Sequence, residues 1–166
     1  MNMYFDKDKA GRDILVMEDA KIFWTNFSGR PDKFNKQGGK RHFCLELPNE
    51  APLIEDMLAD GWNIKWTKPK NEEYEPAPYI DVNISWDYKA PVVTFITSGG
   101  ETDVTEDIVG QIDTAEITKV DMALDLSYSK RDDGGRRIKG YVKTMDVYLY
   151  EDPIRRRRFE RMRNGE

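Results

Sequence analysis

The sequence predicts a mainly β fold, an antiparallel barrel or sandwich with two short helices. Apolar and polar residues alternate in short segments that are separated by turn residues at regular spacing. In the stretch 130–137, Asp-Gly-Gly supplies residues that tolerate positive φ between two long alternating segments. No internal repeat or long linker divides the chain. We therefore expect one domain over residues 1–152, followed by a tail at 153–166.

Strands are expected where this alternation is clearest. They are placed at residues 14–17, 20–27, 43–47, 62–67, 79–86, 92–97, 120–128 and 138–150. In the second of them, Trp24 shares one face with Ala20 and Ile22, whereas Phe23 and Phe27 share the other. Because both faces carry aromatic rings, one of them can be available to a ligand instead of the core.

The remaining segments are expected to be helical, bulged or irregular. A helix is predicted over 50–60, with Asn49 as its N-cap and Gly61 as its stop. A second helix is expected to be capped by Thr105 and to carry Ile108, Val109 and Ile112. In the last strand the apolar residues change from even-numbered to odd-numbered positions near Thr144, which predicts a β-bulge. A polar lead-in is expected at 1–12, and a turn-rich connector at 68–78.

Length and composition restrict the class of protein. A chain of 166 residues buries roughly 68–70% of its unfolded surface, so it needs no metal or disulfide to fold. No apolar run approaches the ~20 residues of a membrane span, and the first residues lack a secretory signal. The single cysteine, Cys44, is typical of a reducing compartment. We expect a cytoplasmic protein with no membrane partner.

Several kinds of chemistry are disfavoured by the residues present. One cysteine and one histidine are too few for a Cys/His zinc site, and side-by-side packing explains His42 and Cys44 better than a nucleophilic pair. The run from Gly38 to Arg41 lacks the phosphate-loop pattern and precedes a strand instead of a helix. Surface solvation explains Asp81, Asp121 and Asp125 better than a two-metal site does. We expect no enzyme activity, no metal and no cofactor.

The segment 21–44 has the most informative composition. It carries six Lys and Arg residues against one acidic residue, in a chain whose net charge is −5. Cationic side chains interleaved with flat rings suit single-stranded nucleic acid, because the cations follow phosphates while the rings stack on bases. The alternative is a hairpin whose aromatic residues belong to the core and whose basic tip is merely solvated. An acidic body with one basic ribbon would confine DNA to a single groove.

A resemblance to a known family strengthens the first alternative. The segments IFWTNFSGRPDKFNKQGGKRHFCLEL, DGWNIKWTKP, PYIDVNISW, PVVTFITSGG and GYVKTMDVYLYED resemble bacteriophage-encoded single-stranded DNA-binding proteins of the OB-fold type. The likeness covers roughly residues 14–152, and NFSGRPDKFNKQGGKRHF is its most specific part. It implies an OB-fold-like antiparallel Greek-key barrel with extra strands and two short helices, which binds DNA across one face and the adjoining loops.

The C-terminal tail departs from a common pattern in such proteins. Many end in an acidic tail that recruits replication partners and shields the DNA groove, whereas the last 16 residues here are rich in arginine. Recruitment of partners by the tail is therefore not expected. The tail can be a frayed helix, a disordered arm or a segment that orders on binding. It can add phosphate contacts or contact an acidic surface of another subunit.

We therefore predict a single-stranded DNA-binding protein with little sequence preference, which protects DNA in phage replication or recombination. Its partners would be single-stranded DNA and replication or recombination proteins of phage or host, and a homo-oligomer is possible. The residues expected to contact phosphates are Arg30, Lys33, Lys36, Lys40, Arg41, Lys65 and Lys68. Those expected to stack on bases are Trp24, Phe27, Phe34, Trp66 and Tyr79. The alternatives are a protein-interaction module, such as a phage structural component or an inhibitor of a host factor, and a metal-dependent nuclease.

Overall fold

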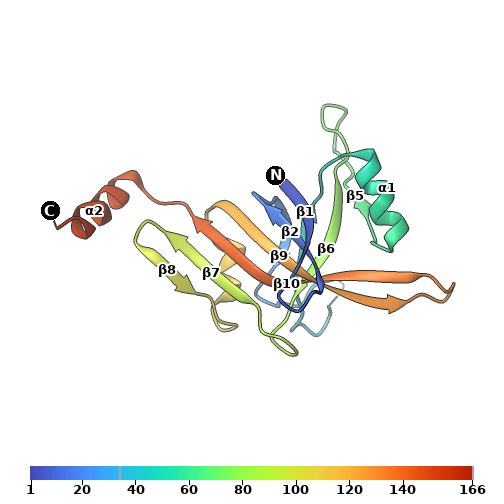
Figure 1. Ribbon diagram of the computed structural model, residues 1–166. Helices are drawn as coiled ribbons and strands as arrows, with labels where there is room; N and C mark the ends of the chain where they lie inside the picture. The colour runs from blue at the N-terminus through green and yellow to red at the C-terminus, as the bar shows by residue number, and fades with distance from the viewer. Residues whose placement is uncertain (34, 166) are drawn as a thin grey trace.

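The computed structural model describes residues 1–33 and 35–165, and within them ten strands form one sheet (Figure 1). The strands are β1 (Asn2–Lys7), β2 (Asp13–Glu18), β3 (Ile22–Asn26), β4 (Arg41–Glu46), β5 (Lys65–Trp66), β6 (Pro78–Ile84), β7 (Val92–Thr97), β8 (Gly100–Asp103), β9 (Ile117–Lys130) and β10 (Arg136–Leu149). The helical elements are α1 (Ala51–Asp60), the 3-10 helix η1 (Val109–Thr114) and α2 (Pro153–Arg163).

The sheet is organised around β10. Its strand order is β1-β2-β9-β10-β6-β4-β3, while β5 pairs with β6, and β7 pairs with both β10 and β8. β10 runs antiparallel to β9 along its whole length, parallel to β6 through its first half and parallel to β7 through its second half. The chain is therefore mainly β, and its twisted sheet with short helices is an OB-like fold with extra strands, as the sequence predicts.

A single hydrophobic core lies inside the curved sheet. The buried side chains alternate along β6, β9 and β10, as expected for strands with one wet face. Helix α1 closes the core on one side by burying Ile54 and Met57. The largest fully buried side chains are Phe27, Phe43, Leu15, Met17, Leu45, Leu47, Met57, Ile80, Leu124 and Met145. Side chains of the opposite parity on β6 and β10 remain outside the core and form the exposed face described below.

Most local predictions are confirmed. The hairpin between β9 and β10 turns at 131–135, and the register of this pair shifts between Val142 and Thr144, where a bulge was expected. Gly61 ends α1 with a left-handed φ of 114°, donating its N–H to the carbonyls of Met57 and Leu58. A Cβ at this position would collide with the carbonyl oxygen of Arg136, so glycine is also needed where α1 meets the hairpin.

Other local predictions are wrong. Asn49 does not cap α1; the N-cap position is Glu50, which makes no side-chain capping bond. The helix expected from Thr105 is instead the short 3-10 helix η1, which begins at Val109. The polar lead-in contains β1, which pairs with β2, because an edge strand needs no apolar alternation on its solvent side. The strand predicted over 92–97 ends as expected, but the sequence gives no sign of β8, which starts at Gly100 and pairs with it.

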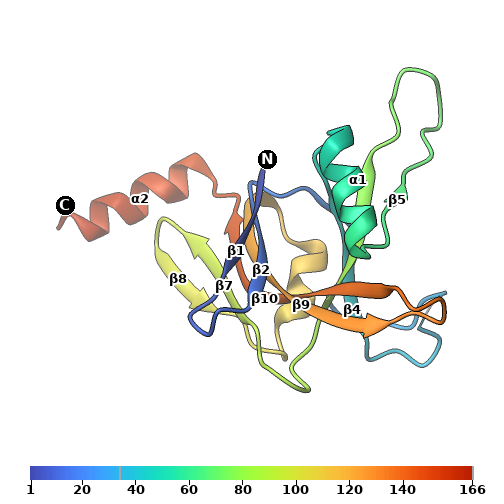
Figure 2. The ribbon, with the colours of Figure 1, turned by 45° about the vertical axis from the view of Figure 1, so that its right-hand side comes forward.

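The arginine-rich tail forms α2, which extends away from the sheet beyond β7 and β8 (Figures 1 and 2). Arg163 donates a hydrogen bond to the carbonyl of Ser98 at 3.2 Å, and Arg156 lies 3.9 Å from Glu160 within the helix. Of the tail's predicted alternatives, the structure has a helix. The division of the chain at residue 152 stays a prediction.

Candidate nucleic-acid interface

Trp24 lies on a bulge in β3 that turns its indole out of the core. The pairing of β3 with β4 is regular at Ile22 and Phe23, and then shifts register before Asn26. Trp24 has φ 47°, in the left-handed region that non-glycine residues avoid. Such backbone strain costs of order 1–3 kcal/mol and is concentrated at functional sites. Here it leaves the Trp24 side chain 63% exposed.

The bulge brings three aromatic rings together on the outer face of the sheet. The ring of Phe23 meets that of Trp24 edge to face, with centroids 4.8 Å apart, and meets Tyr79 of β6 at 5.2 Å. Trp24 and Tyr79 are 5.5 Å apart and nearly perpendicular. Edge-to-face pairs of this kind fix ring orientation. A planar group arriving from solvent would therefore meet a rigid aromatic platform.

The same bulge makes the prediction for Phe27 wrong. An unbroken strand would place Phe27 on the same face as Phe23, but the register shift reverses the alternation after Trp24. Phe27 is fully buried and stacks on Phe43, with ring centroids 5.2 Å apart. It has no exposed ring face on which a base could stack. Phe23, which was not among the predicted site residues, takes the place next to Trp24.

The basic segment after β3 is held in shape by its own polar side chains. Asn26 is 2% exposed; its amide donates to the Arg30 carbonyl and to Asp32, both at 2.9 Å, and its oxygen accepts from Arg30 N–H. Asp32 also lies 2.8 Å from His42 Nε2 and accepts from the backbone N–H of Asn35. These bonds order the backbone, so Lys36 and Lys40 are carried on the outside of an ordered loop.

Asp113 of η1 attaches this loop to the rest of the domain. Its carboxylate accepts from the backbone N–H groups of Phe27 and Ser28, each at 2.9 Å, and lies 3.2 Å from Arg30 Nη1. Partial burial alone would raise the pKa of Asp113, but the hydrogen bonds to its ionised form hold that pKa below the ordinary value. The interaction that positions the loop is therefore a charged one.

Arg41 has a largely structural position. Its Nε donates to the Phe27 carbonyl at 2.9 Å and its Nη1 lies 3.1 Å from Glu106, while the guanidinium faces the ring of Trp86 at 6.0 Å. The sequence predicts a phosphate contact here, but two of its five N–H donors are already used, and its charge is paired with Glu106. Lys33 is exposed and has an interaction within the protein. Phe34 lies outside the described residues.

Lys65 and Trp66 of β5 lie at the far end of the same face. Lys65 Nζ lies 2.7 Å from Asp81 Oδ2, and this hydrogen bond raises the pKa of Lys65. Asp81 Oδ1 accepts from Cys44 Sγ at 3.3 Å. Lys65 pairs with Tyr79 and Arg41 with Ile84, so they are separated by five residues of β6, or about 17 Å. Trp66 and Lys68 are exposed beyond Lys65.

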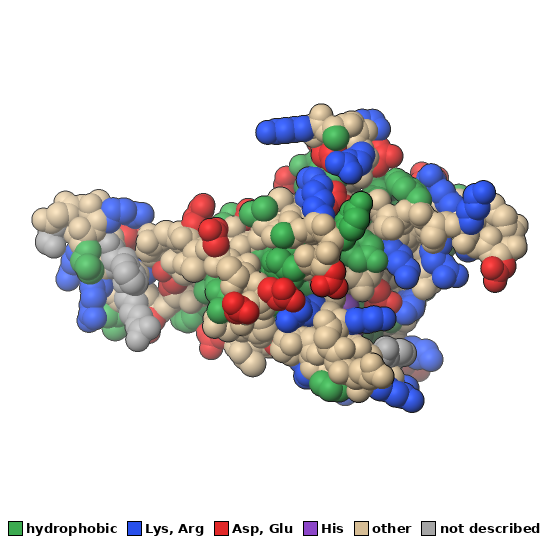
Figure 3. All heavy atoms as spheres, turned by 90° about the horizontal axis from the view of Figure 1, so that it is seen from below, with side chains coloured by type: hydrophobic (Ala, Val, Ile, Leu, Met, Phe, Trp, Pro, Cys, Tyr) green, Lys and Arg blue, Asp and Glu red, His purple; other side chains and the backbone are tan. Residues whose placement is uncertain are grey.

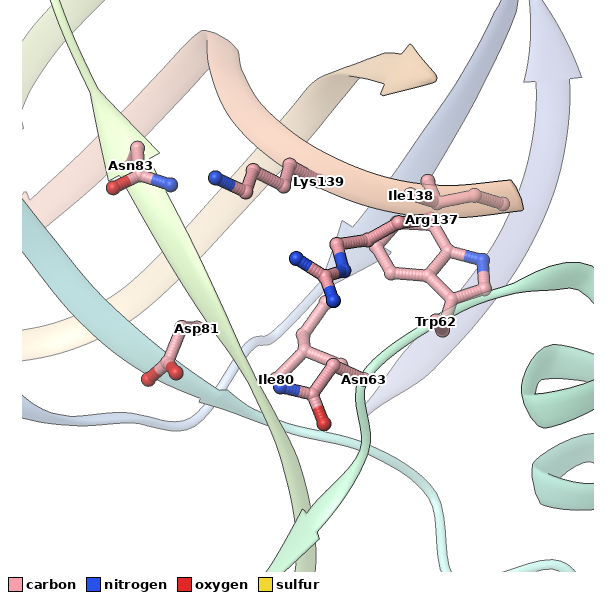
Figure 4. Close-up of a pocket in the computed structure, with 8 residues that line it drawn as sticks. All are labelled: Trp62, Asn63, Ile80, Asp81, Asn83, Arg137, Ile138 and Lys139. Atoms are coloured by element: carbon pink, nitrogen blue, oxygen red, sulfur yellow. The ribbon is translucent and has the colours of Figure 1, made fainter. Parts of the chain in front are cut away.

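The structure adds a group of basic residues that the sequence did not single out. Arg137 and Lys139 project from β10 into a cavity of about 250 Å³ between β10 and β6, whose lining includes Asp81, Asn83 and Trp62 (Figure 4). Figure 4 shows the Lys139 amine directed toward Asn83. Neither cation forms an ion pair with another described residue. In the sequence, Arg137 and Lys139 are marked only by their alternation with the apolar Ile138. This pattern places them on the solvent face of their strand, but it does not show that β6 is the neighbouring strand.

The basic side chains gather in two places. Viewed from below, Lys and Arg lie over the β9–β10 hairpin and on the segment before β4, with exposed hydrophobic side chains between them (Figure 3). The arginine side chains of α2 form a second group at the opposite end of the molecule. Trp24, Tyr79 and Lys65 share one face with Arg137 and Lys139, and the lysine-bearing loop lies at its edge. That these side chains contact DNA stays a prediction.

A comparison with protein families shows which family the chain belongs to. Residues 6–162 match the sequence profile of the family described as "Putative phage ssDNA-binding domain". The chain belongs to this family of phage single-stranded DNA-binding proteins. No curated protein matches the chain in sequence. The resemblance inferred from the basic segment is confirmed.

Solved structures of phage proteins have the same fold. The single-stranded DNA-binding protein of bacteriophage Enc34, solved in complex with single-stranded DNA, matches with a TM-score of 0.55 and 12% identity, over 92% of this chain and 98% of that one. A C-terminal truncation of the Enc34 protein matches with a TM-score of 0.54, again at 12% identity and over the same shares of the two chains. At this identity the likeness establishes the fold alone.

Two properties of the described residues concern membrane insertion and metal binding. Within residues 1–33 and 35–165, no helix is long and apolar enough to cross a membrane. In the same part of the chain, no three His, Cys, Asp or Glu side chains are grouped so that they could hold a metal ion.

Proposed function

We propose that this protein binds single-stranded DNA across the outer face of β3, β4, β6 and β10, with little base preference. The observation that carries the proposal is the aromatic platform of Phe23, Trp24 and Tyr79, which lies on the same sheet face as Arg137 and Lys139. Bases have π-faces that stack on such rings whatever their identity, and cations alongside the rings neutralise phosphates. A double helix hides its bases from such a platform.

The cations are proposed to contribute unequally. Arg30, Arg41 and Lys65 are ion-paired with Asp113, Glu106 and Asp81, so a phosphate has to compete with an existing partner. The exposed cations without a described ion pair are the better candidates for phosphate contacts. On this face and in the segments beside it they are Lys36, Lys40, Lys68, Arg137 and Lys139. Five contacts at roughly 0.7 per phosphate predict a log–log salt slope near −3.5.

The experiment is a titration with oligo-dT that follows tryptophan fluorescence over a series of salt concentrations. Binding quenches the emission of Trp24, the most exposed of the four tryptophans. The affinity should fall steeply with salt, and oligo-dC of equal length should bind comparably because phosphate contacts carry little base information. Absence of binding at low salt would remove the proposal. The same titration with RNA measures the preference between the two polymers.

A charge-reversal variant tests the loop without disturbing the fold. Lys36→Glu with Lys40→Glu changes two exposed side chains and should weaken binding to all sequences alike. Arg41→Glu is a poor test, because it would also break the bonds to Phe27 and Glu106. The variant's melting temperature should match that of the wild type, since neither lysine contacts the core.

The biological role proposed for this binding is protection of unwound strands during phage replication or recombination, in the host cytoplasm and without catalysis. Replication or recombination proteins of phage or host are the proposed partners. A pull-down that survives nuclease treatment, from a protein that fails to bind DNA, would instead favour a protein-interaction module. Cleavage of labelled DNA that depends on Mg²⁺ or Mn²⁺ would indicate a nuclease.

A further inference from the structure

A second cavity lies on the same outer face, on the far side of β10 from the aromatic platform. Its volume is about 500 Å³, and its lining includes Tyr88, Tyr141, Leu126 and Val142. This size falls within the roughly 300–1,000 Å³ of typical small-molecule sites, in which apolar walls carry a few polar groups. The rings of Tyr88 and Tyr141 are the aromatic groups among the lining residues here.

The register of the sheet places the two cavities at neighbouring positions of one face. Tyr141 pairs with Asn83 across β10 and β6, and Asn83 lines the first cavity while Ser85, just past the end of β6, lines the second. Lys139 in the first cavity and Tyr141 in the second are two residues apart on β10. Residues two apart on a strand share a face. A DNA strand that follows β10 past the first cavity would therefore reach the second.

The charges around the second cavity permit a polyanion to approach. Its two acidic side chains are each held by cations: Asp13 lies 2.7 Å from Lys7, and Asp125 lies 3.4 Å from Lys143 and 3.7 Å from Lys89. Arg12, at the rim, is 3.6 Å from Asp8. The repulsion that unpaired carboxylates would exert on phosphate is thus reduced. Lys89 is exposed beside the opening, and because Asp125 also lies 3.4 Å from Lys143, Asp125 keeps a cationic partner when Lys89 turns to a phosphate.

The positions of the two tyrosines match this use. Tyr88 is fully exposed on the loop between β6 and β7, and Tyr141 is 37% exposed on β10, so both rings can be reached from solvent. From these observations we infer that the second cavity is a further nucleotide subsite. In it, Tyr88 and Tyr141 contact the base, while Lys89 contacts a phosphate of the strand that crosses β10 from the Trp24 platform. The inference rests on the proposed single-stranded DNA binding.

The test compares short and long oligo-dT on the full-length protein by fluorescence anisotropy. Tyr88→Ala and Tyr141→Ala should weaken binding of an oligonucleotide long enough to cross β10 by about fivefold to thirtyfold, the lower part of the range for one stacked base. They should leave unchanged the binding of one that spans the Trp24 platform alone. Tyr88→Phe should bind normally, because the ring and not the hydroxyl stacks.

Two controls keep the outcomes distinct. Tyr150→Ala removes an exposed tyrosine at the other end of β10 and should have no effect at either length. If wild type and Tyr88→Ala bind long oligo-dT equally while Trp24→Ala binds weakly, the subsite is refuted and the proposed function stands. If wild type binds neither length, the proposed function itself fails. Because Tyr88 is fully exposed, its replacement does not threaten folding.

A photo-crosslink supplies a readout that no loss of stability can imitate. Oligonucleotides carrying 5-iodouracil at successive positions are irradiated with the wild-type protein, and the modified peptides are sequenced. We expect crosslinks to Trp24 or Tyr79 from one region of the strand and to Tyr88 or Tyr141 from another. Crosslinks confined to the first pair at every position would overturn the inference.

Discussion

The rings of Trp24 and Tyr79 meet edge to face, 5.5 Å apart, although 54 positions separate them in the sequence. Trp24 reaches this contact only because its backbone adopts φ 47°. Trp24→Ala should weaken binding of oligo-dT by about 5- to 100-fold, the range for loss of stacking on a base, and should remove most of the fluorescence quenching. An unchanged affinity would show that the platform does not bind DNA.

The strained φ at Trp24 makes a separate prediction about stability. Trp24→Gly should be more stable than Trp24→Ala by about 1 kcal/mol in urea unfolding, since glycine adopts a left-handed φ without cost. Trp66 supplies the matched control, because it is also an exposed tryptophan on a strand but lacks a positive φ. At that position glycine should be the less stable replacement. If the alanine variant is more stable than the glycine variant at both positions, the bulge relaxes when the indole is removed.

Arg137 and Lys139 should contribute to binding as charges. Replacing both with glutamine should make the salt slope shallower by about 1.4, at roughly 0.7 per phosphate contact, with equal loss for every DNA sequence. Lys119→Gln is the matched control: it is an exposed strand lysine held by Asp121 and by the ring of Tyr148, at the opposite end of β9. A slope that does not differ from that of the wild type would place the phosphates elsewhere.

Asp113 should make the stability of the domain sensitive to acid. Its pKa is lowered in the folded protein, so its contribution is present above the ordinary value of 3.8 and is lost as pH falls through the lower, folded value. Asp113→Asn should unfold with a smaller dependence on pH in this acidic range. It should also be less stable at pH 7, by about 1–3 kcal/mol, because hydrogen bonds to the Phe27 and Ser28 N–H groups are weakened. Parallel pH profiles for the two proteins would contradict this role.

Cys44 should be unreactive while the protein is folded. Burial, followed by the hydrogen bond to Asp81, raises the pKa of its thiol from 9.0 to about 12. Only the thiolate is nucleophilic, so iodoacetamide at pH 8 should modify the folded protein far more slowly than the urea-unfolded protein. The raised pKa also stabilises the fold below pH 9, and this contribution is lost as pH rises toward 12. Fast alkylation of the folded protein would show that this part of β4 opens.

The mainly β class, most of the strands, the β9–β10 hairpin and the bulge near Thr144 follow from the alternation and turn residues of the sequence. Each of these features is determined by residues that are close together in the sequence, so a local sequence pattern is enough to predict it. The aromatic–basic composition of segment 21–44 likewise indicated single-stranded DNA binding. Phe27 shows the limit of such reasoning, because one unpredicted register shift in β3 was enough to move its ring from the surface to the core.

What only the tertiary structure decided is which side chains share a surface. Tyr79 meets Trp24, and Arg137 lines a cavity with Asn83, because β4 and β10 pair on opposite sides of β6. It also decided that Arg41 and Lys65 are held by carboxylates distant in sequence. The sequence by itself determined the class of fold and the kind of ligand. Strand pairing between distant segments, which no local pattern encodes, determined where that ligand can lie.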